Sequence, residues 1–209
     1  MIKRIWDISE PIEEGTAVWP GDTPMTREWV MRMAEGHSCD VSTIRMTVHC
    51  GTHADSPAHY VEGGRDSAGS ELWPYIGPCR VVAVTPVGDP ALVPPAALDR
   101  LEGVARVLLR TSDAHDHRRF DEGFCALGPE AASRVVELGL RLVGIDTPSM
   151  DTFASKDLPS HKILSRGEVA LLENLDLRGV PEGDYELIAL PLRIVGSDAS
   201  PVRAVLIER

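Results

Sequence analysis

Long apolar runs are missing from this sequence. No stretch of the 209 residues approaches the roughly 20 consecutive apolar residues that a membrane-spanning helix needs. The first residues, from Met1 to Asp7, also lack the apolar core of a secretory signal. We therefore expect a cytoplasmic protein without a membrane partner.

Basic residues are also in short supply. Lysine and arginine number 21 against 32 aspartates and glutamates, so the formal net charge is −11. A surface this acidic repels phosphate backbones, which argues against nucleic acid as a partner. Hydrophobic residues at 43% and charged residues at 25% are ordinary for a globular protein. The length suits one domain over residues 1–209, although two small domains are also compatible with it.

Cysteine is scarce as well. The four cysteines lie far apart and show no paired spacing; they are Cys39, Cys50, Cys79 and Cys125. In a cytoplasmic protein this distribution favours free thiols over a disulfide framework.

What the chain does have is a cluster of ionisable side chains between residues 49 and 59. Three of the seven histidines and one aspartate fall there, at His49, His53, Asp55 and His59. A single histidine is most often an ordinary polar residue, but three at regular spacing around an aspartate indicate a metal site. Imidazole and carboxylate donors of this kind suit zinc or manganese.

The residues before this cluster predict how it is arranged. Polar and apolar residues alternate from Thr43 to Val48, which predicts a strand with one polar and one apolar face. Extended through Gly51, the alternation places the donors at 49, 53 and 55 on the polar face and Cys50 on the core side. The spacing of four between the first two histidines would also fit a helical zinc site. Gly51 within the span and Pro57 after it disfavour that helix.

Elsewhere the pattern indicates short strands and few helices. Residues 129–138 are predicted to form a helix, with Pro129 in its first turn and Gly139 after its end. The predicted strands are aliphatic and bounded by Gly, Pro or Asp; they cover residues 81–84, 104–110, 140–145, 186–190 and 202–206. The helix and the strands on either side of it form a predicted βαβ unit. We therefore expect an α/β fold with a mixed β-sheet core flanked by a few helices, and a site in loops at the carboxyl ends of strands.

The residues from His49 to His59 match the pattern H-x-G-T-H-x-D-x-P-x-H, and on this pattern the chain resembles the metal-dependent cyclase-like hydrolases. Further blocks resemble the bacterial kynurenine formamidases (arylformamidases) within that family; they are residues 6–9, 18–24, 144–149, 184–192 and 198–206. The resemblance implies a cyclase-like fold of the swivelling β/β/α type. It also implies two divalent metal ions per subunit, with Zn²⁺ as first choice and Mn²⁺, Co²⁺ or Fe²⁺ also admitted by these donors.

The same resemblance assigns the site residues. The metal ligands are His49, His53, Asp55, His161 and Glu173. The last two match the family pattern of a histidine after the loop of residues 148–159 and a glutamate further on. Glu168 is the competing carboxylate, and without the resemblance Glu173 would be interpreted as a solvated helix residue.

Two further residues carry expectations with open alternatives. By resemblance His59 is the catalytic acid/base, a role that suits histidine because it titrates near neutral pH; the alternative is a further metal ligand. Trp19 could bind the substrate by stacking on an aryl ring, or it could anchor a loop in the core. His115 and His117 lie in the charged run of residues 113–119, which we interpret as a solvated surface loop.

The activity implied by the resemblance is hydrolysis of N-formyl-L-kynurenine to L-kynurenine and formate by a binuclear metal-bound hydroxide. One alternative is a relative that cleaves a cyclic amide such as isatin. Another is a non-catalytic metal-binding module, against which the presence of both His59 and Trp19 argues. We also expect a homodimer, because the resemblance implies one and because residues 10–24, with three prolines and Trp19, look too long to fold back without a partner surface.

Overall fold

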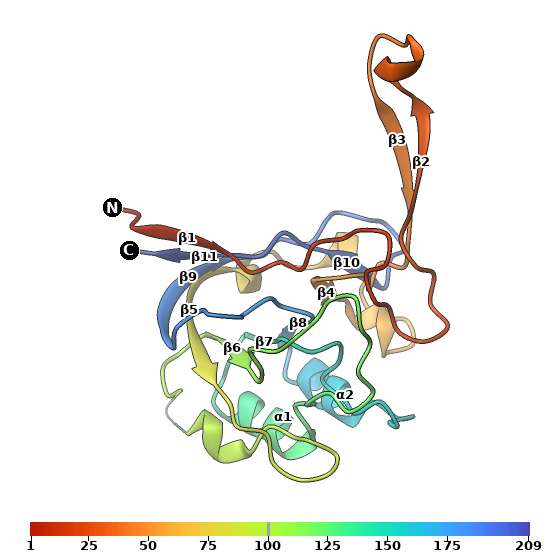
Figure 1. The fold of residues 1–209 in the computed structure, drawn as a ribbon. Coiled ribbons are helices and arrows are strands. Elements are labelled where there is room, and N and C mark those ends of the chain that lie inside the picture. The colour runs from red at the N-terminus through yellow and green to blue at the C-terminus, as the bar shows by residue number, and fades with distance from the viewer. Residues whose placement is uncertain (100) are drawn as a thin grey trace.

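A computed structural model describes residues 1–99 and 101–209 of the chain. Its centre is a seven-stranded sheet with the order β1-β11-β9-β5-β6-β7-β8 (Figure 1). These strands are β1 Arg4–Asp7, β5 Ile76–Ala83, β6 Arg106–Arg110, β7 Leu142–Ile145, β8 Ala170–Leu172, β9 Gly183–Ile188 and β11 Val205–Glu208. From β5 to β8 neighbouring strands run parallel, and from β5 to β1 they run antiparallel. The predicted α/β fold with a mixed sheet is confirmed.

Two α-helices cover one face of the parallel half of the sheet (Figure 1). Helix α1, Pro129–Glu137, agrees with the prediction, with proline in its first turn and Gly139 in a left-handed conformation after its end. Together with β6 and β7 it forms the predicted βαβ unit. Helix α2, Pro159–Arg166, was not predicted. Short 3₁₀ helices complete the connections; they are η1 Met33–Glu35, η2 Pro57–His59, η3 Ser67–Gly69, η4 Trp73–Tyr75 and η5 Pro95–Leu98.

The core lies on both faces of the sheet. Strand β6 shows this best, because Val107 and Leu109 pack toward the helices while Leu108 packs into the cluster on the opposite face. Burial on both sides explains why the parallel strands are continuous aliphatic runs rather than alternating ones. Burying each such side chain stabilises the fold by about 1.5–3 kcal/mol.

The strand expected over residues 202–206 forms only in part, because the chain bends at residues 202–204 and β11 begins at Val205. Before the bend, Ala199–Pro201 form the short strand β10, which pairs with β4, His53–Asp55. The bend is held by backbone bonds to two different segments, from the Val202 amide to the Thr52 carbonyl and from the Ile8 amide to the Ala204 carbonyl. The prediction missed the bend because residues 202–206 are aliphatic apart from Arg203.

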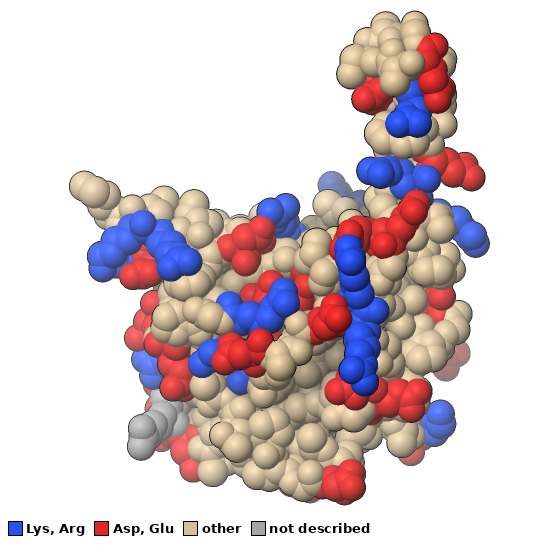
Figure 2. Space-filling view, in the orientation of Figure 1, with Lys and Arg blue, Asp and Glu red and all other residues tan. Residues whose placement is uncertain are grey.

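The continuous strand expected through residue 51 is wrong. Strand β3, Val41–Arg45, pairs with β2, Thr26–Met31, in a hairpin that projects from the body (Figures 1 and 2). Residues 46–52 are loop, and β4, His53–Asp55, begins after them. Gly51 takes φ +66°, which ends any extended run. The predicted apolar face is not in the core, since Ile44 is 55% exposed on the hairpin, whereas Cys50 is fully buried as predicted.

In the part of the chain that the structure describes, no helix has both the length and the apolar character required to cross a membrane.

Candidate metal centre and its pocket

Strand β4 supplies the middle of the candidate site. His53 and Asp55 are two residues apart on this strand and therefore point to the same side, while Ala54 points into the core. His49 reaches them from the preceding turn, and His59 lies on η2, which Pro57 begins. The alternation therefore predicted correctly that His53 and Asp55 share one side of a strand. His49 does not lie on that strand and reaches the site from the turn before Gly51.

Two other elements bring His161 and Glu173 to the same place. Glu173 directly follows the buried strand β8 and forms a β-bridge with His53. His161 lies in the first turn of α2. Its Nε2 atom is 3.3 Å from Oε1 of Glu173 and 3.5 Å from Oδ2 of Asp55. Glu173 is only 3% exposed, and the competing Glu168 is exposed on the surface.

The distances inside this cluster leave room for cations. His49 Nδ1 lies 3.2 Å and His53 Nε2 lies 3.4 Å from Oδ1 of Asp55, and His53 Nε2 is 3.4 Å from Oε2 of Glu173. These contacts are longer than charge-assisted hydrogen bonds, which are typically about 2.7–2.9 Å. Both carboxylate oxygens of Asp55 and the Nε2 atom of His53 are buried and have no hydrogen-bond partner among the described residues. Such atoms require a ligand, and divalent metal ions fit them.

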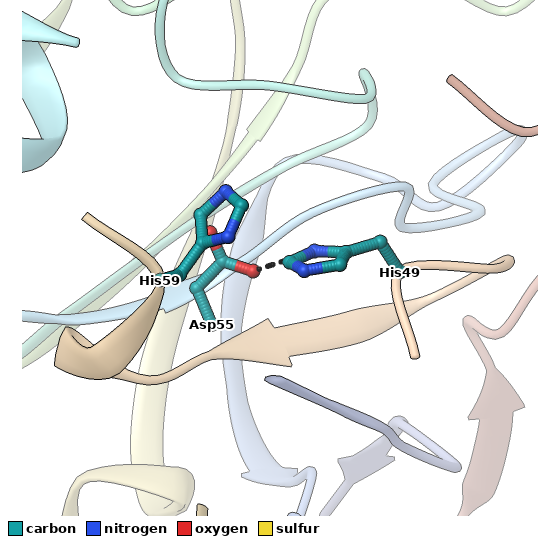
Figure 3. A group of neighbouring side chains, drawn as sticks. All are labelled: His49, Asp55 and His59. Carbon is teal, nitrogen blue, oxygen red and sulfur yellow. Dashed lines mark ion pairs between the residues drawn. The ribbon is translucent and has the colours of Figure 1, made fainter. Parts of the chain in front are cut away.

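The donors form two overlapping groups that could each hold an ion. One consists of His49, Asp55 and His59 (Figure 3), and the other of His53, Asp55 and Glu173. Asp55 belongs to both, and its two oxygens face different histidines. The two candidate groups therefore have one carboxylate in common.

In contrast, the ring nitrogens of His49, His53 and His161 that do not face Asp55 or Glu173 make short hydrogen bonds. His161 Nδ1 is 2.7 Å from Oδ2 of Asp151, and His49 Nε2 is 2.9 Å from Oδ2 of Asp198. His53 Nδ1 is 2.9 Å from the carbonyl oxygen of Gly51. A histidine that donates one ring N–H in this way presents the other nitrogen, without a proton, to a metal.

Sequence reasoning missed Asp151 and Asp198. Asp198 lies in a block that resembles the formamidases, but its contact with His49 joins distant parts of the chain. Asp151 is buried and also accepts hydrogen bonds from the amides of Ser160 and His161, at the first turn of α2. One carboxylate therefore holds both this turn and the imidazole ring that the turn carries.

The carboxylates control the protonation of the buried rings. Burial disfavours a charged His53, but Asp55 and Glu173 outweigh that effect and raise the pKa of His53 to about 10. The pKa of His161 is likewise raised, because Asp151, Asp55 and Glu173 together overcome its burial. Without metal, protons therefore occupy the positions next to the carboxylates.

His59 is more exposed than the other three histidines of the donor cluster, His49, His53 and His161. Its side chain is 33% exposed, and its Nδ1 atom lies 3.5 Å from Oδ2 of Asp198. Its ring centroid is 4.3 Å from that of His49. A ring that borders the donors and reaches solvent can exchange a proton with a bound molecule, although it also belongs to one of the possible ligand groups.

A pocket of about 740 Å³ opens over these donors. Its floor includes residues that follow the parallel strands, such as Thr111 after β6, Asp146 after β7 and Glu173 after β8. Asp146 accepts hydrogen bonds from the amides of Thr111 and Ser112, which fixes the loop after β6. The site therefore lies at the carboxyl ends of parallel strands, as the sequence predicts.

One wall of the pocket is aromatic. Trp19 lines it, and its ring packs against three phenylalanines, with centroid distances of 5.3 Å to Phe120, 6.1 Å to Phe124 and 5.1 Å to Phe153. Trp19 is half-buried. It is thus anchored by other rings and still faces the pocket, so the two interpretations of this residue are compatible.

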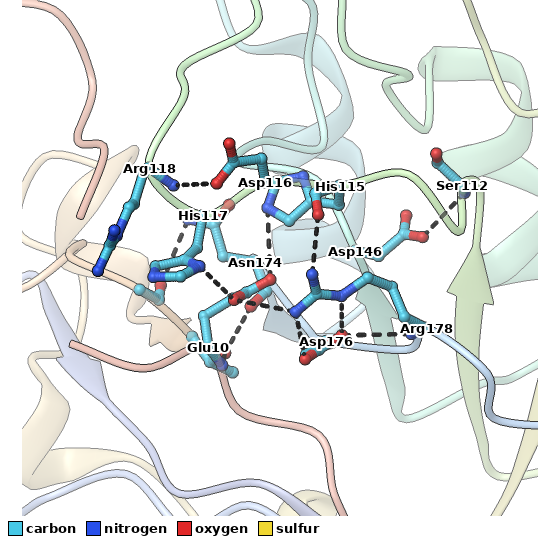
Figure 4. A network of polar contacts seen from close by, with 12 residues as sticks. Glu10, Ser112, His115, Asp116, His117, Arg118, Asp146, Asn174, Asp176 and Arg178 are labelled. Atoms are coloured by element: carbon cyan, nitrogen blue, oxygen red, sulfur yellow. Dashed lines mark hydrogen bonds and ion pairs between the residues drawn. The ribbon is translucent and has the colours of Figure 1, made fainter. Parts of the chain in front are cut away.

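Another wall is polar, and here the solvated loop expected for residues 113–119 needs correction. His115 and His117 are half-buried, line the pocket and face the buried carboxylate of Glu10 at 3.5 and 3.6 Å (Figure 4). Arg178 lies 3.7 Å from the same carboxylate. His115 and His117 therefore belong to a polar network that also includes Glu10 from the N-terminal segment.

Comparison with known proteins places the chain in a family. Residues 6–152 match the model of the Cyclase family, described as putative cyclase. The chain is 44% identical over 211 residues to the kynurenine formamidase of Bordetella avium, and the match covers 99% of each protein. It is 42% identical over 208 residues to the kynurenine formamidase of Bordetella petrii, again over 99% of each.

Solved structures agree with this placement. A potential metal-dependent hydrolase with cyclase activity superposes with a TM-score of 0.83 at 34% identity, covering 99% of this chain and 98% of the other. Isatin hydrolase A from Labrenzia aggregata superposes with a TM-score of 0.78 at 21% identity, covering 98% and 93%, and so shares the fold. The chain is a member of the cyclase family of metal-dependent hydrolases, and among its full-length homologues are bacterial kynurenine formamidases.

Proposed function

We propose that this chain, as one domain over residues 1–209, hydrolyses N-formyl-L-kynurenine to L-kynurenine and formate in tryptophan breakdown. The observation that carries the proposal is a single pocket in which a set of metal-binding donors lies beside an aromatic wall. An aryl formamide needs both, a polarising site for the formyl carbonyl and an apolar surface for the ring. The full-length similarity to two kynurenine formamidases supports the same substrate.

In this proposal five residues hold two divalent ions, Zn²⁺ being the first choice; they are His49, His53, Asp55, His161 and Glu173. When bound, such ions lower the pKa of water toward about 7 and polarise a carbonyl oxygen. Asp151 and Asp198 keep His161 and His49 in the tautomer that binds metal. The loop after β6, held by Asp146, closes the floor of the pocket.

His59 acts as the acid that protonates the departing aniline nitrogen. An arylamine leaves readily only when its nitrogen receives a proton, and His59 is the exposed imidazole beside the donors. Asp198 lies between His59 and His49 and would orient both rings. Trp19 and the two phenylalanines that line the pocket with it, Phe120 and Phe124, would hold the substrate ring.

The second candidate is hydrolysis of a cyclic amide such as isatin. The isatin hydrolases share the fold, but at 21% identity or less among the compared structures that similarity extends to the fold alone. Steady-state kinetics on N-formyl-L-kynurenine and on isatin separate the two. The proposal expects kcat/KM to be higher for the formamide by at least about a hundredfold, and a preference for isatin would overturn it.

We also propose a homodimer in which the β2–β3 hairpin contacts the second copy. Several apolar side chains on or near this hairpin are exposed; they are Trp29, Val30, Met33, Val41 and Ile44. Monomeric proteins seldom expose so many neighbouring apolar residues. Light scattering should give twice the 22.7 kDa chain mass. The double variant Val30→Glu, Ile44→Glu should be monomeric, whereas a monomeric native protein would refute this part.

A further inference from the structure

Two cationic side chains line a pocket whose other permanent charges are negative. Among the described residues that line it, Arg119 and Lys156 are the only lysine or arginine. The acidic lining residues are Glu10, Asp22, Asp116, Asp121, Asp146 and Glu173. The metal donors are taken up by the formamide in the proposed function, and away from them a bound carboxylate would find positive charge only near these two cations.

Both cations are available to a ligand. Arg119 and Lys156 are exposed, and across residues 1–99 and 101–209 neither side chain has a hydrogen bond or an ion pair. Neighbouring arginines are occupied, since Arg118 binds Glu13 at 2.7 Å and Arg178 binds Asp176 at 2.7 Å. In a chain with 32 acidic residues, two cations that line one pocket without a hydrogen bond or ion pair are an exception that a ligand would account for.

The two cations belong to the loops that also supply rings packed on Trp19. Arg119 directly precedes Phe120, and Lys156 is three residues after Phe153. Both phenylalanine rings pack on Trp19, with centroid distances of 5.3 and 5.1 Å. Two separate loops therefore each contribute one cation to the pocket and one ring to the packing around Trp19.

We propose that Arg119 and Lys156 form the subsite for the α-carboxylate of the amino-acid substrate. The inference rests on the proposed function, because it needs an aryl formamide whose ring carries a side chain with an anionic end. With the formamide at the metal donors and the ring against Trp19, that side chain extends toward the exposed edge of the pocket. The planar fork of arginine suits a carboxylate, and the lysine adds a mobile point charge.

This subsite makes the pocket selective for aryl formamides that carry a carboxylate. Formanilide, which has the ring and the formamide but no anionic end, makes no use of it. The carboxylate is remote from the reacting carbon, so its contacts are equal in ground and transition states. Their loss therefore raises KM and leaves kcat nearly unchanged.

The test compares Arg119→Gln, Lys156→Gln and the double variant on N-formyl-L-kynurenine and on formanilide. Each single variant should raise KM for N-formyl-L-kynurenine by about tenfold, as expected for a charged hydrogen bond that water partly screens. The double variant should raise it further, and its kinetics on formanilide should match the native enzyme. Added salt should weaken binding of N-formyl-L-kynurenine by the native enzyme and have little effect on the double variant.

Two controls keep the outcomes distinct. Arg193→Gln removes an exposed arginine that does not line the pocket, and it should behave as the native enzyme on both substrates. Arg119→Lys should restore most of the affinity, because it retains the positive charge. Equal losses on both substrates, or no loss on either, would overturn the subsite while the proposed function stands. A native enzyme that cleaves neither substrate would overturn both.

Discussion

Nδ1 of His161 lies 2.7 Å from Oδ2 of Asp151, and both side chains are buried. This contact determines which nitrogen of His161 faces the other donors. It also joins the loop after β7 to the first turn of α2, since Asp151 accepts two amides of that turn. The donor on α2 is therefore positioned by a residue of the loop that leads into the helix.

The first prediction concerns this contact. Asp151→Asn should weaken metal binding by about 10–100-fold, the usual effect of removing a carboxylate behind a ligand histidine. Isothermal titration with Zn²⁺ measures it directly, and activity should return when excess metal is supplied. Asp157→Asn is the matched control, because that aspartate is exposed in the same loop. Unchanged affinity in Asp151→Asn would show that the contact only supports the fold.

The second prediction separates the two roles open to His59. His59→Ala should keep its metal content and lose about 10²–10⁴-fold in kcat, as expected for a lost acid/base group. Elemental analysis and steady-state kinetics on the same preparation provide both values. If metal content falls together with activity, His59 is a ligand and the acid must be sought elsewhere.

The third prediction concerns the aromatic wall. Trp19→Ala should raise KM for aryl formamides by up to about tenfold, since one ring contact contributes about 0.5–1.5 kcal/mol. It should also lower the melting temperature, because three phenylalanines lose a packing partner. Trp73→Ala is the control, a half-exposed tryptophan outside the pocket. A lowered melting temperature with unchanged KM would make Trp19 a core anchor alone.

The fourth prediction is a pH dependence of metal affinity. In the metal-free protein the pKa of His53 is raised to about 10, so at pH 7 the ring is protonated and metal must displace that proton. Affinity should therefore rise from pH 7 toward pH 9, by about tenfold per unit for each proton released. Titrations in buffers of different ionisation enthalpy count these protons. Binding without proton release would contradict the proposed role of His53.

The sequence was informative where local spacing determines geometry. His53 and Asp55 share one face of a strand, so their parity predicted their convergence. Helix α1 was predicted because proline and glycine mark its two ends. The loops after the parallel strands carry the pocket, as the βαβ pattern indicated.

The sequence was uninformative where contacts join segments that are distant along the chain. Nothing near His115 or His117 indicates that Glu10 lies against them, so a half-buried network was interpreted as a solvated loop. Helix α2 was missed although Pro159 begins it and Gly167 follows it, the same kind of signals that marked α1. The alternation before residue 49 arises in a projecting hairpin, so it did not report burial.

The most direct test of the account is turnover of N-formyl-L-kynurenine before and after exhaustive chelation, with metal content measured at each step. The native protein should hold about two ions per chain, lose turnover when the metal is removed, and recover it when Zn²⁺ is restored. His53→Ala and Asp55→Ala should lose metal and turnover together, because the buried donor atoms they remove have no other partner among the described residues. Full turnover by the chelated, metal-free protein would contradict metal-dependent hydrolysis at this site.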